Sequence, residues 1–288
     1  MLILVFLTIY PFWYAVISSL NSGIDLSRGP VFFWPREFTF ASWHAVLSDP
    51  GLLRATWITA SRTAIVTVIS ILYTAMFAYA FSRPYLMARK WVMILGFTSM
   101  YFSGGLIPSF LLINWLGLYD HYLVYIIPSL FAGFWNVIIF NANYKALPDA
   151  LFESAKIDGA GEFSIFFRIV LPLSKPVLAA LSVFTAVGVW NDYGTTLYFT
   201  QSSELQTLQY LVLKLIQTST AVEQLSSTAA LSNPAVSELL SLAQGQGLVT
   251  SRTIELASMV IVSIPMIVMY PFAQRYFIKG VLLGSVKG

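Results

Sequence analysis

The feature that most constrains this chain is a series of six apolar runs that carry almost no charge. They cover residues of about 2–20, 57–82, 91–116, 122–141, 176–199 and 254–277. Each reaches the roughly 18 residues that cross the hydrocarbon core of a bilayer, and each is too continuous for a barrel strand. Because a backbone in lipid must satisfy its own hydrogen bonds, the runs predict helices. We therefore expect an all-α polytopic membrane protein with six transmembrane helices in a single domain, residues 1–288.

Composition supports this assignment. Of the 288 residues, 57% are apolar and only 10% are charged, whereas soluble domains carry about 25% charged residues. The chain has no cysteine, so it cannot form a disulfide or a thiolate metal site. Its formal charge of +3 is small, and we do not interpret it as nucleic-acid binding. The first run lacks a basic leader and a small-residue cleavage site and contains Pro11, which favours a span over a cleaved signal peptide.

If each run crosses the membrane, successive loops lie on opposite sides of it, and lysine and arginine are distributed unequally between these two sides. One side holds ten of them: Arg83, Arg89, Lys90, Lys145, Lys156, Arg168, Lys175, Arg275, Lys279 and Lys287. The other side holds six: Arg28, Arg36, Arg54, Arg62, Lys214 and Arg252. Because the richer side of a membrane protein faces the cytoplasm, both termini and the loop 145–175 are predicted to lie inside. Segments 21–56 and 200–253 are predicted to face outward.

The cytoplasmic loop 145–175 has helix signals of its own. Pro148 suits the first helical position, Asp149 suits the positive end of the helix dipole and Gly159 suits a left-handed stop, which predicts a short helix over 148–158. Several residues there are small enough for another surface to approach closely: Ser154, Ala155, Gly159, Ala160 and Gly161. A second helical stretch, about 162–170, is expected next. Its apolar side chains are predicted to pack against the rest of the chain: Phe163, Phe166, Phe167 and Ile169.

This loop also carries a spaced motif. Glu153-Ser154-Ala155 is followed by Gly159 and, after nine further residues, by Ile169-x-Leu171-Pro172. The spacing resembles the EAA loop of bacterial ABC importer permeases, E-A-A-x3-G-x9-I-x-L-P, with Ser154 in place of the first alanine. An ordinary helical hairpin that only connects two spans is the alternative. The complete spacing and the position between two spans favour the EAA loop.

The resemblance extends over most of the chain. Residues 190–193 and the ending from 271 to 288 look like those of carbohydrate-uptake permeases of the maltose-permease type. That family implies a type I importer fold in the bacterial cytoplasmic membrane, a second homologous permease subunit, two cytoplasmic ATPases that bind ATP and Mg, and an extracytoplasmic solute-binding protein. It also implies that a coupling helix around Glu153 docks on the ATPase. The residues assigned to this contact are Glu153, Ser154, Ala155, Asp158, Gly159, Ala160, Leu171 and Pro172.

The resemblance implies that the chain forms half of a path for oligosaccharides. Overall likeness to polysaccharide-import permeases adds acidic oligomers such as alginate to the candidate solutes, and no residue decides between neutral and acidic ones. Candidates to line the path are Trp190, Asn191, Asp192 and Tyr193. Asp192 is the one acid well inside a run, where a carboxylate needs a partner or a water-filled path. It either touches the solute or pins helices together, and we favour pinning because intramembrane polar groups often bond neighbouring helices.

Two further segments have open interpretations. The outer segment 200–253 begins with leucines at helical spacing and then becomes rich in Ser, Thr, Ala and Gln. In related permeases this segment faces the binding protein, which makes Gln224, Gln244 and Gln246 contact candidates. A linker without contacts is an equal alternative. Ser103-Gly104-Gly105 and Pro108 interrupt the third run, as a hinge, a cavity lining or a tolerated kink.

Catalysis by this chain is not expected. It has no G-x-x-x-x-G-K-[ST] phosphate loop, so ATP hydrolysis is assigned to separate subunits. Both histidines, His44 and His121, fall in outer segments, which disfavours an intramembrane protease or metalloenzyme. An ion-coupled secondary transporter is the second hypothesis, but it should show duplicated halves and several buried ionisable groups. We assign no catalytic, cofactor-binding or metal-binding residue to this chain.

Overall fold

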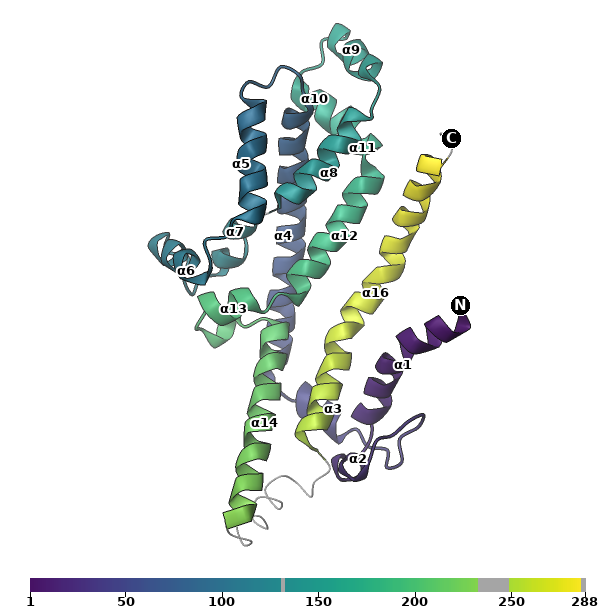
Figure 1. The fold of residues 1–288 in the computed structure, drawn as a ribbon, viewed down its shortest axis with the longest axis vertical. Coiled ribbons are helices and arrows are strands. Elements are labelled where there is room, and N and C mark those ends of the chain that lie inside the picture. Colours follow the sequence, from purple (N-terminus) through teal and green to yellow (C-terminus); the bar gives the residue numbers. More distant parts are fainter. Residues whose placement is uncertain (131–132, 233–248, 286–288) are drawn as a thin grey trace. The chain divides into compact units, whose positions relative to one another are not determined.

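The computed structural model describes residues 1–130, 133–232 and 249–285 (Figure 1). Every named element in these ranges is helical, which confirms the all-α class, and one isolated antiparallel bridge joins Asn21 and Phe38. The elements are α1 (Leu2–Ser19), α2 (Gly23–Arg28), α3 (Ala41–Leu47), α4 (Pro50–Ser82), α5 (Arg89–Tyr101), α6 (Leu106–Trp115), η1 (Tyr122–Tyr125), α7 (Ile127–Leu130), α8 (Phe134–Lys145), α9 (Asp149–Ile157), α10 (Glu162–Ile165), η2 (Phe166–Val170), α11 (Leu171–Leu173), α12 (Lys175–Asn191), α13 (Gly194–Phe199), η3 (Ser203–Leu205), α14 (Leu208–Ser232) and α16 (Ser251–Ser285).

The chain divides into two compact units. The first comprises Met1–Ile58 and Gln206–Ile267, and the second comprises Thr59–Leu205 and Val268–Gly288. Helices α4 and α16 contribute residues to both units.

Each of the six predicted runs contains a helix or a bent pair of helices. Within the described ranges, α4 and the part of α16 over Ser251–Val268 are long and apolar enough to cross a membrane unaided. Up to five spans result if each of three bent helix pairs counts as one, and the apolar part of α1, Ile3–Ser19, is shorter. The number of six spans stays a prediction.

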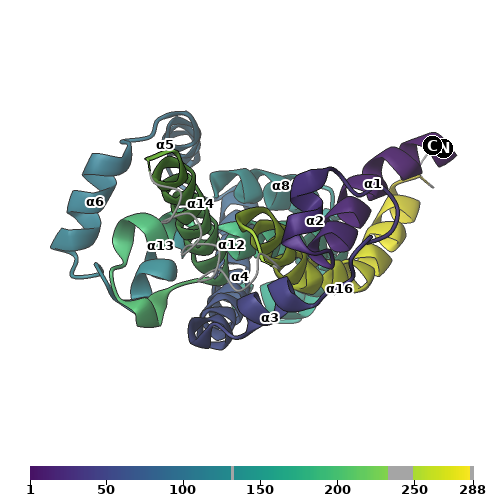
Figure 2. The same cartoon turned by 90° about the horizontal axis from the view of Figure 1, so that it is seen from below.

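The third run is broken where the sequence predicts an interruption. Helix α5 ends before Ser103-Gly104-Gly105, α6 begins after it, and their axes differ by 115° (Figures 1 and 2). Gly105 has a φ of 83°, a left-handed conformation that glycine adopts without steric cost. Pro108 lies in the first turn of α6, where a missing backbone N–H removes no helix hydrogen bond.

Several helix boundaries differ from the sequence-based expectation. Helix α4 begins at Pro50, seven residues before the predicted start at 57, and α12 ends at Asn191 rather than continuing to Phe199. Helix α14 continues to Ser232, far into the stretch rich in Ser, Thr and Gln. The early end of α12 has a physical cause in a buried arginine, described below.

The core of the second unit gathers residues from α4, α8, α9, α10, η2 and α12. Its buried members are Ile71, Ala75, Ala78, Tyr79, Phe81, Val137, Phe140, Tyr144, Phe152, Ala155, Ile165, Phe166, Val170 and Leu181. Ala75 and Ala78 are fully buried on one face of α4, and such small residues let helices approach closely. Because Phe152 and Ala155 belong to this cluster, the short helix α9 is part of the packed unit.

In the first unit, the segment after α1 is organised by the buried side chain of Asn21. Its amide nitrogen donates to Asp25 Oδ2 at 2.8 Å, and its amide oxygen accepts from the Glu37 backbone N–H at 2.9 Å. Arg36 also forms an ion pair with Asp25 at 2.8 Å. The hydrogen bonds from Asn21 and Arg36 hold the pKa of the Asp25 carboxyl below its usual value.

Candidate functional site

Helix α9 is defined by local signals at both ends. Pro148 precedes it with a φ of −61° and a ψ of 132°, and Asp149 lies in its first turn. Its C-terminus forms a Schellman motif: Gly159 N–H donates to Lys156 O at 3.0 Å, and Ala160 N–H donates to Ala155 O at 2.9 Å. Gly159 has the required positive φ of 76°. The helix predicted over 148–158 is therefore confirmed to within one residue at each end, with Pro148 as the N-cap rather than the first helical residue.

The two faces of α9 differ in chemistry. Phe152 and Ala155 face the core of the second unit, and Ala155 is only 8% exposed. The small side chain of Ala155 thus brings α9 close to its own chain and offers no free surface. The exposed residues of α9 include Glu153, Ser154 and Ile157, and Asp158 and Gly159 directly after the helix are exposed as well. Ile157, a residue outside the set predicted for the ATPase contact, is 86% exposed.

The stretch after α9 packs through fewer aromatic residues than predicted. Phe166 is buried as expected, but Phe163 is 71% exposed and Phe167 is also exposed, so the prediction is wrong for these two. The buried face is completed by Ile165 and Val170. The reason is the helix period: positions 165, 166 and 170 share one face of the α10–η2 turn, whereas 163 and 167 point away.

Pro172 accounts for the irregular backbone here. Residues Phe166–Val170 form a π-helical turn in which Leu171 N–H donates to Phe166 O. Proline has no backbone N–H to donate to the carbonyl four residues earlier, and the wider π-helical turn accommodates this missing hydrogen bond. Leu171 is half-buried, Pro172 is exposed, and the chain bends by 81° between this stretch and α12.

Glu162 ties α9 and α10 to the end of α4. Its Oε2 accepts a hydrogen bond of 2.5 Å from the Tyr79 hydroxyl, and its Oε1 lies 3.3 Å from Lys156 Nζ. Partial burial raises the pKa of the Glu162 carboxyl, but the hydrogen bonds from Tyr79 and Tyr85 and the charge of Lys156 outweigh it. The net pKa lies below the usual value, so the carboxylate stays ionised at neutral pH.

A second polar cluster lies where α12 ends, and it gives Asp192 its partner. Arg62 Nη1 lies 3.2 Å from Asp192 Oδ2, and Arg62 Nη2 donates to Val189 O at 2.8 Å and to the Asp192 carbonyl. The guanidinium also lies 4.9 Å from the centre of the Tyr125 ring. A cation on the free carbonyls of a helix C-terminus stabilises that end, which explains why α12 stops at Asn191.

These contacts support the helix-pinning interpretation of Asp192. Arg62 is predicted from the sequence to be one of six outward-facing charges, but its side chain is 1% exposed inside α4, so that prediction is wrong for Arg62. Arg62 is the only Lys or Arg between Arg54 and Arg83, and this isolation in an apolar run was the signal that could have identified it. Of the other path candidates, Trp190 is buried, while Asn191 and Tyr193 are exposed.

The predicted contacts with a binding protein fall partly outside the described residues. Gln224 lies in α14 and is exposed. Gln244 and Gln246 lie in 233–248, outside the ranges that the structure describes. Their role stays a prediction.

Comparisons with known proteins agree with this architecture. Residues 86–283 match the family described as binding-protein-dependent transport system inner membrane component. The chain is 36% identical over 282 residues to Protein LplC of Bacillus subtilis (strain 168), covering 98% of this chain and 90% of that protein. It is 32% identical over 288 residues to the polygalacturonan/rhamnogalacturonan transport system permease protein YtcP of the same organism, covering 100% and 96%.

A solved structure shares the fold. It is a chain of a bacterial ABC transporter involved in the import of the acidic polysaccharide alginate, and it aligns with a TM-score of 0.81 and 27% sequence identity. The alignment covers 96% of this chain and 92% of that chain. Together with the family match, this confirms the resemblance to sugar-importer permeases and disfavours an ion-coupled secondary transporter. The chain belongs to the family of binding-protein-dependent transport system inner membrane components, the permease subunits of ABC importers.

Proposed function

We propose that this chain forms half of the translocation path of an ATP-driven oligosaccharide importer and docks on a separate ATPase through α9. The observation that carries the docking is the two-sided chemistry of α9. Phe152 and Ala155 anchor one side in the core, while Glu153, Ser154 and Ile157 are exposed on the other. A short, capped helix held in this way presents a rigid surface that another subunit can bind.

The partners follow from this role. A second permease subunit supplies the other half of the path, two cytoplasmic ATPases bind ATP and Mg, and an extracytoplasmic binding protein delivers the solute. ATP binding draws the ATPases together and displaces α9, which opens the path toward the loaded binding protein. Both termini and α9 face the cytoplasm in this proposal, as the lysine and arginine distribution indicates.

The proposed solute is an oligosaccharide that contains uronic acids. The support comes from relatives: YtcP is named for polygalacturonan and rhamnogalacturonan transport, and the similar solved structure belongs to an alginate importer. Arabinooligosaccharides and lactose appear in the names of less similar relatives, so neutral sugars are the natural competitors in a test.

Uptake into proteoliposomes tests the proposal. The chain, its partner permease, the ATPase and the binding protein are reconstituted together. We expect uptake of galacturonate oligomers to require internal ATP and the binding protein, and to be unaffected by collapse of ion gradients. Uptake that follows an ion gradient without ATP would contradict the importer. Uptake of neutral oligosaccharides in preference to uronates would contradict only the solute class.

Cysteine labelling tests the orientation separately. The chain has no cysteine, so Ile157→Cys and Leu53→Cys each introduce a single thiol at an exposed residue, 86% and 83% exposed respectively. A membrane-impermeant maleimide added outside intact cells should label residue 53 and spare residue 157. The opposite pattern would place α9 on the outer face and contradict docking on a cytoplasmic ATPase.

A further inference from the structure

A buried arginine holds α9 against the end of α4. Arg83 follows the last residue of α4, and its side chain is buried. Its guanidinium carbon lies 3.9 Å from the centre of the Phe152 ring on α9 and 4.8 Å from the centre of the Tyr79 ring on α4. Both distances are within the range of cation–π attraction, and a planar guanidinium can stack on aromatic faces. Arg83 therefore connects the two helices through their aromatic side chains.

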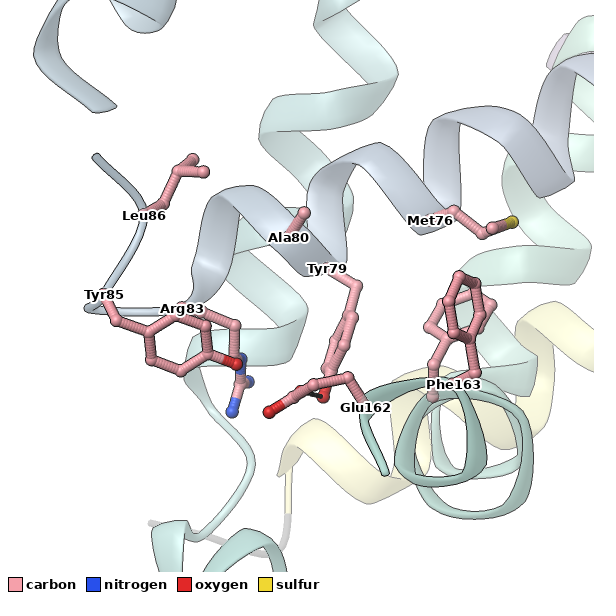
Figure 3. A pocket seen from close by; sticks show the side chains of 9 residues that line it. Met76, Tyr79, Ala80, Arg83, Tyr85, Leu86, Glu162 and Phe163 are labelled. Carbon is pink, nitrogen blue, oxygen red and sulfur yellow. Dashed lines mark hydrogen bonds between the residues drawn. The ribbon is translucent and has the colours of Figure 1, made fainter. Parts of the chain in front are cut away.

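Tyr79 also links α4 to the C-terminal end of α9, through Glu162. Its hydroxyl points to the carboxylate of Glu162 (Figure 3) and donates the hydrogen bond of 2.5 Å. Glu162 in turn binds Lys156 near the C-terminus of α9. Helix α9 is thus attached to the end of α4 at two points, Phe152 near its middle and Lys156 near its end.

The contacts of Arg83 and Glu162 lie beside a cavity. A cavity of about 280 Å³ lies beside Tyr79, Arg83 and Glu162, with Met76 and Phe163 in its apolar lining (Figure 3). On the side that faces the cavity, no close-packed side chains hold α9 against α4. The stacking of Arg83 and the hydrogen bond to Glu162 therefore hold the junction there, and a single substitution should loosen it while the core cluster behind Phe152 and Ala155 stays packed.

We infer that Arg83 is a positioning residue for coupling: together with Tyr79 and Glu162 it transmits displacement of α9 to α4. This inference rests on the proposed docking of α9 on an ATPase. Nothing in it requires Arg83 to touch ATP, the ATPase or the solute. Its consequence is that loss of the stacked guanidinium separates ATP hydrolysis from transport without preventing docking.

Three measurements on the reconstituted importer test this inference. Ile157→Cys serves as a crosslinking site that reports docking on the ATPase, ATP hydrolysis is measured in the same vesicles, and uptake is expressed per ATP hydrolysed. Arg83→Met keeps an unbranched apolar stem but removes the planar charge. We expect the crosslink and ATP hydrolysis to persist and uptake per ATP to fall roughly tenfold, within the range of coupling between distant sites.

Two further variants sharpen the test. Arg83→Lys keeps the charge but not the planar stacking surface, and we expect it to restore uptake per ATP only in part. Tyr79→Phe keeps the ring and removes the hydrogen bond to Glu162, and we expect a smaller loss than in Arg83→Met. If Arg83→Met does not fold, Tyr79→Phe carries the test.

Arg89→Met is the matched control. Arg89 lies at the start of α5, and its guanidinium carbon is 5.4 Å from the centre of the Phe81 ring, which belongs to α4 and not to α9. Its uptake per ATP should match the unsubstituted chain. An unchanged ratio in Arg83→Met, or an equal fall in Arg89→Met, would overturn the role of Arg83. If the unsubstituted chain with Ile157→Cys gives no crosslink to the ATPase, the proposed docking fails instead.

Discussion

Two buried arginines, 21 residues apart along the α4 segment, are stabilised in different ways. Arg62 binds a carboxylate and two backbone carbonyls at the end of α12. Arg83 lies against the faces of Tyr79 and Phe152, and its Nε donates a hydrogen bond to the neighbouring Ser82 hydroxyl. The first arginine makes directional contacts with another helix, and the second makes stacking contacts.

The difference indicates different mechanical roles. Hydrogen bonds weaken steeply when their geometry changes, so Arg62 defines one arrangement of the break between α12 and α13. Stacking on a ring face tolerates small sliding, so Arg83 can keep α9 attached to α4 while the surfaces shift. Arg62 is therefore a structural pin, whereas we infer that Arg83 is part of a moving junction.

The largest effect is predicted for removal of the Arg62 guanidinium. Arg62→Met leaves the Asp192 carboxylate and the two carbonyls without their cation. Loss of one partner of a fully buried ion pair costs about 3 kcal/mol, and because the Asp192 side chain is 36% exposed, we expect a smaller cost here. We expect a marked drop in the free energy of unfolding. Thermal unfolding of the purified chain in detergent measures it.

A double variant separates the ion pair from the packing of the side chain. Arg62→Met combined with Asp192→Asn removes both charges, and we expect it to be less unstable than the sum of the two single variants. Additive losses would show that Arg62 acts through its carbonyl and ring contacts and not through Asp192. Arg83→Met should reduce stability less than Arg62→Met, because it leaves no carboxylate unpaired.

A smaller effect is predicted at the end of α9. Gly159→Ala places a side chain on a residue with a φ of 76°, which costs about 1 kcal/mol. Gly161→Ala is the matched control, since it has no positive φ, and an added Cβ would meet no atom within 4 Å at either position. Protease or hydrogen-exchange protection of α9 should fall in the first variant only. Equal protection of α9 in the two variants would contradict the requirement for a left-handed residue at the C-terminus of α9.

The smallest effect concerns pH and Glu162. Because the folded-state pKa of Glu162 is lowered, its contribution to stability is present above the usual glutamate pKa of 4.5 and is lost as the pH falls through the folded value. A spin label at residue 157 should therefore become more mobile at acid pH. In Glu162→Gln the contribution of this carboxylate is absent, so the acid-induced change should shrink. A transition of the same size in both proteins would contradict this assignment.

The parts that could be predicted from the sequence are those that local chemistry determines. Pro148, Asp149 and Gly159 act on their own turn of backbone, so the position of α9 was predicted to within one residue. The break at Ser103-Gly104-Gly105 was predicted for the same reason. The apolar runs also predicted helices correctly, because each of them contains a helix or a bent pair of helices.

Contacts between distant residues could not be predicted in this way. Arg62 and Asp192 are 130 positions apart, and Tyr79 and Glu162 are 83 positions apart. Nothing in a linear pattern states which helices will face each other. Ala155 shows the same limit: its small size predicted a surface open to a partner, whereas in this chain the same small size brings α9 close to the core.

The most direct test of the account is a crosslink from α9 to the ATPase. Ile157→Cys, the sole thiol of the chain, is paired with single cysteines along the groove of the ATPase in the assembled importer. We predict crosslinks in the nucleotide-free state, with a pattern that shifts when ATP binds. If residue 157 crosslinks to no ATPase position in either state while the importer remains active, α9 is not the docking helix.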